Sequence, residues 1–83
     1  MWPPWWEWDL ALTGHAERRM EERGITEVDL RSMRQRATGY APSVVERRFM
    51  IPTSHGGRPW MVIVEPDGDE RLLVVVTAYE AAR

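Results

Sequence analysis

The sequence contains no cysteine. Disulfide bonds, thiolate zinc sites, iron–sulfur clusters and a cysteine nucleophile are therefore all excluded. No apolar run approaches the roughly 20 residues that a membrane span needs. The N-terminus lacks a basic start and carries Glu7 and Asp9, so it does not resemble a signal peptide. We therefore expect a cytoplasmic protein with no membrane partner.

Lysine is also absent, so all 11 basic residues are arginines. A GC-rich genome, which favours arginine codons, is one explanation. Phosphate binding is the other, because the guanidinium group binds phosphate through two parallel hydrogen bonds. Residues 15–58 hold nine arginines against six acids, a net charge of +3, within a chain whose net charge is −2. An acidic chain argues against broad nucleic-acid binding, so any anion site must be local to this middle segment.

The chain is long enough for one small domain, with 83 residues and 43% hydrophobic residues. Residues 1–11 form a Trp-rich arm, and residues 12–83 are expected to form a single α+β domain. The arm holds too much apolar surface to leave in water. It either folds back on the domain or binds a partner, and base stacking is a third possibility. Its tryptophans are Trp2, Trp5, Trp6 and Trp8.

Two helices are predicted in the first half of the chain. Thr13 is positioned to cap a helix over residues 14–23, which a glycine then ends. Thr26 caps a second helix, and its spacing to Asp29 is close to that of a capping box. The second helix runs to about residues 35–37. The apolar residues predicted to be buried by the two helices are Ala16, Met20, Leu30, Met33 and Ala37.

The rest of the chain has the pattern of an antiparallel meander. Strands are predicted over residues 44–51, 60–65 and 72–79. Turns are predicted at 55–57 and at 66–69. The last strand is the most apolar and should be the buried central strand of the sheet. The expected fold is α+β, with two N-terminal helices packed on a three- to four-stranded antiparallel sheet.

One edge of the first helix carries a row of basic side chains. His15, Arg19 and Arg23 are four residues apart and fall within about 80° of each other around the helix. Two arginines at this spacing repel each other unless an anion or an acid lies between them. The row is therefore either a solvated helix face or a surface that binds an anion. We call these three residues the basic row.

Other polar side chains are candidates for contact with a substrate. His55 lies in a glycine-rich turn, where a histidine is more often a loop residue than a catalyst. Arg47 and Arg48 should point to opposite faces of the predicted strand, so only one of them can join a site. Two histidines without cysteine give no metal-binding spacing, and we expect neither a metal ion nor a cofactor. The expected substrate-binding residues are Arg47, His55, Arg58 and Thr77.

Three segments resemble a bacterial family of small uncharacterised domains. HAERRMEERGI at 15–25 is similar to that family's HAxxRMxxRGI signature. GRPWMVIVEPD at 57–67 and LLVVVTAY at 72–79 are similar to its strand–turn–strand end, which closes on a V-T-x-Y element. The resemblance covers about residues 12–79. The family is related to BrnT-like and RelE/ParE-like toxins, many of which are metal-independent ribonucleases neutralised by an antitoxin.

The resemblance implies a catalytic site formed by His15, Arg19, Arg23 and Tyr79. A neutral His15 would take the ribose 2′-OH proton, and the arginines would stabilise the charge that develops on phosphorus. Tyr79 or His55 would protonate the leaving 5′-oxygen. The expected partners are RNA, either free or on the ribosome, and an antitoxin protein. A homodimer through the Trp-rich arm or a sheet edge is also possible.

Two other classes of function fit the same sequence. The protein can be a non-catalytic interaction module whose binding surfaces are the Trp-rich arm and the basic row, since Trp and Arg dominate binding hot spots. It can also be a structural oligomer subunit that pairs through the last strand at a sheet edge. A catalytic site needs His15, Arg19 and Tyr79 to converge, whereas a binding module needs only an exposed patch.

Overall fold

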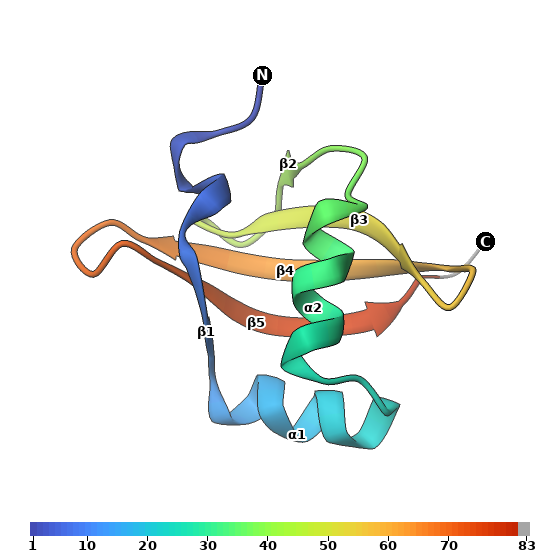
Figure 1. The fold of residues 1–83 in the computed structure, drawn as a ribbon. Helices are drawn as coiled ribbons and strands as arrows, with labels where there is room; N and C mark the ends of the chain where they lie inside the picture. Colours follow the sequence, from blue (N-terminus) through green and yellow to red (C-terminus); the bar gives the residue numbers. More distant parts are fainter. Residues whose placement is uncertain (82–83) are drawn as a thin grey trace.

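The computed structural model describes residues 1–81 and places two helices against a five-stranded sheet (Figure 1). The two-layer α+β class predicted from the sequence is confirmed. The strand order is β1-β5-β4-β3-β2, and helix α2 lies across one face of the sheet. Residues 82 and 83 of the predicted domain lie outside the described residues. The elements are η1 (Pro4–Glu7), β1 (Asp9–Leu12), α1 (Gly14–Arg23), α2 (Glu27–Gln35), β2 (Ala41–Pro42), β3 (Phe49–His55), β4 (Arg58–Asp67) and β5 (Leu72–Glu80).

Both helices begin at the predicted caps. The side chain of Thr13 accepts a hydrogen bond from the backbone N–H of Ala16 at 2.9 Å. Gly24 follows α1 with φ of 70°, a left-handed conformation that glycine adopts without steric cost. Thr26 and Asp29 form a complete capping box at the start of α2. The backbone hydrogen bond from Thr26 to the Asp29 carboxylate, 2.8 Å long, is the main reason why the pKa of Asp29 is lowered.

The Thr26→Ala substitution is expected to lower the free energy of unfolding by about 1 kcal/mol, because the N–H of Asp29 loses its acceptor. Urea unfolding followed by circular dichroism measures this loss, and Thr38→Ala in an exposed loop is the control. The lowered pKa means that Asp29 stabilises the fold above its ordinary pKa and stops doing so as the pH falls through the lowered value. An unchanged urea midpoint for Thr26→Ala at neutral pH would contradict the role of the cap.

Strand β3 differs from the strand predicted at residues 44–51. It begins at Phe49 and runs through Pro52 to His55. The predicted strand stopped before Pro52, because proline has no backbone N–H to donate to a neighbouring strand. β2 pairs only with the first two residues of β3, so the backbone of Pro52 faces an edge where no strand requires that donor. Arg47 and Arg48 therefore precede the strand instead of alternating along it. Arg47 sits in the loop before β3 with φ of 71°.

The hairpin between β4 and β5 turns later than predicted. β4 continues through Pro66 to Asp67, and these residues pair with Leu73 and Leu72. The turn then occupies residues 68–71, because a carboxylate oxygen of Asp67 accepts hydrogen bonds from the N–H groups of Asp69 and Glu70. A β-bulge lies farther along β5, where the register between the two strands shifts.

Two strands, β1 and β2, were not predicted, because residues 9–12 and 41–42 lie outside the three predicted strands. β1 pairs in parallel with β5, from Asp9 opposite Leu72 to Leu12 opposite Val75. The sheet therefore has one more strand than the expected upper number of four, and β5 lies between β1 and β4. β5 is thus an interior strand, in agreement with its strongly apolar sequence, but the central strand of the five is β4 and not β5 as predicted. β1 spans the predicted boundary between the Trp-rich arm and the domain.

The Trp-rich arm folds back on the domain. Trp5 and Trp6 are each only 8% exposed and belong to the hydrophobic core. The Trp5 ring lies 5.0 Å from the ring of Phe49, and Trp2 stacks on Trp6 at 4.3 Å. The first of the alternatives for the arm is thus confirmed. Trp2 itself remains 47% exposed.

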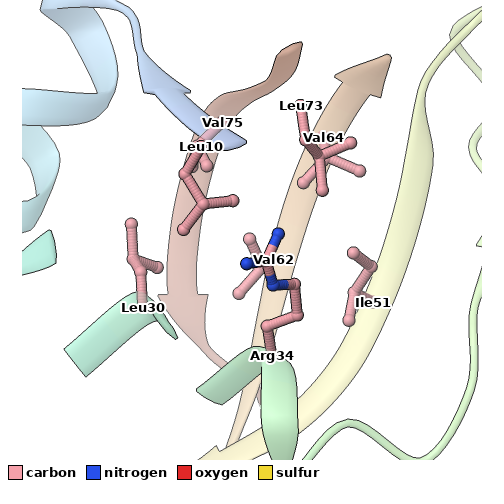
Figure 2. Close-up of a pocket in the computed structure, with 8 residues that line it drawn as sticks. All are labelled: Leu10, Leu30, Arg34, Ile51, Val62, Val64, Leu73 and Val75. Atoms are coloured by element: carbon pink, nitrogen blue, oxygen red, sulfur yellow. The ribbon is translucent and has the colours of Figure 1, made fainter. Parts of the chain in front are cut away.

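A side chain of α2 ties this arm in place. Arg34 extends from α2 into the apolar space between the helix and the sheet (Figure 2). Its guanidinium donates a hydrogen bond of 2.7 Å to the carbonyl of Trp8. It lines a cavity of only about 10 Å³ together with Leu10, Leu30, Ile51, Val62, Val64, Leu73 and Val75. The stem of Arg34 therefore packs on the core while its charged end holds the chain just before β1.

We expect Arg34→Met to lower the free energy of unfolding by about 1.5–3 kcal/mol, the usual contribution of a hydrogen bond to a charged group. Methionine retains most of the apolar stem but leaves the Trp8 carbonyl without its donor. Thermal and urea unfolding measure the effect, and Gln35→Met, an exposed neighbour on α2, is the control. Equal stability of Arg34→Met and the unmodified protein would mean that the hydrogen bond contributes nothing net.

Candidate functional site

Helix α1 lies along the edge of β5 where β1 ends. At its start, the N–H of Thr13 donates to the carbonyl of Val75 at 3.4 Å. At its end, the guanidinium of Arg23 donates to the carbonyl of Ala78 at 2.9 Å. The helix thus replaces β1 as the neighbour of β5 over the second half of the strand. Its buried side chains are Ala16 and Met20, as predicted.

The basic row lies on α1 as the helical spacing predicted. His15 and Arg23 are exposed and Arg19 is partly buried. His15 and Arg23 are eight positions apart, which corresponds to about 12 Å along the helix axis. The row is therefore longer than one phosphate group, and Arg19 lies at its centre.

The repulsion between the two arginines of the row is relieved within the chain. Arg19 forms an ion pair of 3.0 Å with Glu22, and Arg23 binds the β5 carbonyl described above. Glu22 was not predicted as the partner of Arg19, although its i, i+3 spacing to Arg19 is a known signal for such a pair. The Arg19–Glu22 pair is largely exposed, with side-chain exposures of 44% and 60%. An exposed pair of this kind contributes about 0–1 kcal/mol, so an incoming anion has little to displace.

Two of the predicted site residues, Arg23 and Thr77, come together at the end of α1, and Tyr79 follows two residues after Thr77 on β5. The Arg23 guanidinium approaches the Thr77 hydroxyl at 3.5 Å. Thr77 and Tyr79 flank the buried Ala78 and so point to the opposite face of the sheet. Tyr79 is 37% exposed. The basic row therefore begins at His15, and its last member, Arg23, lies beside Thr77.

The remaining predicted residues lie elsewhere. The His55 ring packs edge-on against Trp60 at 5.8 Å, on the helix-covered side of the sheet. Arg58 forms an exposed ion pair of 3.1 Å with Glu80. His55 and Arg58 are the last residue of β3 and the first residue of β4, on either side of the turn and at the same end of the sheet as Tyr79. Arg47 precedes the other end of β3, roughly 20 Å away along the strand, and is not part of this group.

Two further features bear on the kind of site. Within residues 1–81, no group of three or more His, Cys, Asp or Glu side chains is placed to hold a metal ion. Over the same residues, no helix is long and apolar enough to cross a membrane. The side chains of the basic row, Thr77 and Tyr79 supply an imidazole, two guanidinium groups, a hydroxyl and a phenol.

Comparison with known proteins identifies the family. A model of a domain of unknown function (DUF4258) matches residues 12–80, and the chain belongs to this family. The matched segment contains the basic row, Thr77 and Tyr79. No curated protein and no solved structure matches the chain.

Proposed function

We propose that this DUF4258 domain is a metal-independent ribonuclease of the toxin class, which acts in the cytoplasm and is neutralised by an antitoxin. The observation that supports it best is the hydrogen bond from Arg23 to the Ala78 carbonyl. This bond holds the basic row beside the Thr77–Tyr79 end of β5. Residues that are 54 or more positions apart in the chain are thereby brought to one surface. The resemblance to BrnT-like and RelE/ParE-like toxins described above points to the same residues.

The proposed mechanism places the reacting phosphate over Arg19. His15 lies one helical turn to one side, and Arg23 with Tyr79 lies one turn to the other. Displacement at phosphorus needs the base and the acid on opposite sides of the phosphate, which this order provides. His15 takes the 2′-OH proton, the 2′-oxygen attacks phosphorus, and the phenol of Tyr79 protonates the leaving 5′-oxygen. Arg19 stabilises the charge that gathers on the phosphate oxygens.

The products of this reaction are a 2′,3′-cyclic phosphate and a free 5′-hydroxyl group. The test incubates the purified protein with RNA in excess chelator, both alone and with translating ribosomes. We expect the RNA to be cleaved in the presence of the chelator, and the fragments to carry a 2′,3′-cyclic phosphate and a 5′-hydroxyl group. Intact RNA in both conditions would contradict the proposal.

A non-catalytic interaction module is the second candidate. Because Trp5 and Trp6 are buried, the Trp-rich arm exposes less aromatic surface for a partner to bind than the sequence predicted. Trp2 and Tyr40 nevertheless remain 47% and 38% exposed, with ring centres 6.2 Å apart. Exposed aromatic rings of this kind are common in binding hot spots. Intact RNA in the test above would favour this candidate.

A further inference from the structure

The face of α1 that carries the basic row also carries an acid. Glu22 follows His15 by two helical turns and lies within about 20° of it around the helix. Arg19 lies between these two residues along the helix axis. Its Nη1 atom donates a hydrogen bond of 3.0 Å to Oε1 of Glu22. The central arginine of the basic row is thus already bound to an anionic group of the same chain.

The carboxylate of Glu22 and a phosphate group compete for Arg19. Both are oxygen anions that accept hydrogen bonds from the guanidinium N–H groups. The side chains of Arg19 and Glu22 are 44% and 60% exposed, so an anion from solvent can reach the pair. Such an anion must either displace the carboxylate or bind next to a like charge. Either route weakens its binding, by about two- to fivefold for charges that are exposed to water.

Arg18 is placed to bind the displaced carboxylate. It precedes Glu22 by four residues, a spacing at which side chains on a helix meet. Arg18 and Glu22 also border the same surface hollow. Within residues 1–81, none of the ion pairs involves Arg18. Its guanidinium bends back over Gly14, where its Nη1 atom would lie 3.5 Å from a Cβ atom on that glycine. Glu22 can therefore exchange one arginine for another without the loss of an ion pair.

We infer that Glu22 occupies the phosphate position at Arg19 in the free protein and moves to Arg18 when RNA binds. Glu22 is thereby an affinity-determining residue, because its charge weakens the binding of an RNA phosphate. Arg18 limits this weakening, since it gives the displaced carboxylate a second partner. The inference rests on the proposed function in that it takes an RNA phosphate as the ligand of Arg19. It adds no step to the cleavage reaction.

The test measures the binding of a short RNA with 2′-O-methyl groups, which cannot be cleaved by attack of a 2′-hydroxyl group. Glu22→Gln removes the competing charge and should tighten binding about two- to fivefold, with a smaller gain at high salt. With cleavable RNA, KM should fall by the same factor while kcat stays unchanged. Glu27→Gln is the matched control, because it removes the same charge from the exposed 2.8 Å ion pair with Arg31 on α2. It should bind like the unmodified protein.

Two outcomes of this test would overturn the inference. One is equal affinity of Glu22→Gln and the unmodified protein. The other is the absence of binding to the RNA by both proteins. Circular dichroism of every variant establishes that it is folded.

A double-mutant cycle tests the role of Arg18. Arg18→Gln alone should weaken binding of the same RNA about twofold or more, because the displaced carboxylate loses its second partner. In the presence of Glu22→Gln, it should change the affinity much less. An equal loss in both backgrounds would mean that Arg18 contacts the RNA itself, and would overturn the exchange. Because binding is measured without cleavage, an inactive protein with the expected affinities would support this inference while contradicting the ribonuclease proposal.

Discussion

Trp5→Ala is expected to lower the free energy of unfolding by about 3–5 kcal/mol, the usual cost of removing a large aromatic side chain from a core. Trp5 is 8% exposed and packs near Phe49, Trp6 and Tyr40. Since small domains are stable by only about 5–15 kcal/mol, this substitution removes a large part of the total. Urea unfolding at equilibrium measures the change.

Trp2→Ala is the matched control in the same arm. Trp2 is 47% exposed, and its main described aromatic contact is the stacking on Trp6 at 4.3 Å. Its removal should cost about 0.5–1.5 kcal/mol, the range of an aromatic pair. If both substitutions cost the same small amount, the arm does not form part of the core.

Arg19→Ala is expected to reduce RNA cleavage about 10²–10³-fold while the protein stays folded. Arg19 lies at the centre of the basic row, and its ion pair with Glu22 is largely exposed. Alanine is also the best helix former, which offsets the loss of that pair. His15→Ala should reduce cleavage by about 10²–10⁴-fold if His15 is the base. Cleavage rates in excess chelator, with thermal unfolding of each variant, measure both effects.

Arg31→Ala is the control for the loss of a surface arginine. Arg31 forms an exposed ion pair of 2.8 Å with Glu27 on α2, similar to the Arg19–Glu22 pair on α1. It should retain full cleavage. Arg23 is less suitable as a probe, because its bond to the Ala78 carbonyl also fixes α1 to β5. Cleavage that survives both Arg19→Ala and His15→Ala would mean that the active site lies elsewhere.

The helices could be predicted from the sequence because their signals are local. Thr13 and Thr26 each act on backbone N–H groups within three residues, and the capping box at Thr26 and Asp29 is complete in the structure. The basic row follows from the same regular spacing. Of the two partners that its arginines bind, one is local in the sequence and one is distant. Glu22 is three residues from Arg19, whereas the Ala78 carbonyl is 55 residues from Arg23 and depends on the tertiary fold.

The strand boundaries were harder to predict because they depend on neighbours in the sheet. Pro52 has the sequence signal of a strand end, yet it is tolerated where β3 has a free edge. β1 has only four residues, too few for a clear alternating pattern, and its pairing with β5 is not local. The predicted strand that contained Arg47 had its start misplaced because strand boundaries depend on pairing within the sheet. Arg47 lies in a loop, and this position separates it from the other predicted site residues.

The pairing of β1 with β5 also bears on the order in which the protein is completed during translation. Asp9 and its partner Leu72 are 63 residues apart, so β1 leaves the ribosome long before the strand that it binds. The meander of β3, β4 and β5 involves only short connections and closes quickly, whereas β1 must wait for the last strand. A nascent chain that has not reached Leu72 has no place for β1 in the sheet. Until then, Trp5 and Trp6 lack the contacts that η1 makes with β5, so we expect the incomplete chain to expose more aromatic surface than the finished protein.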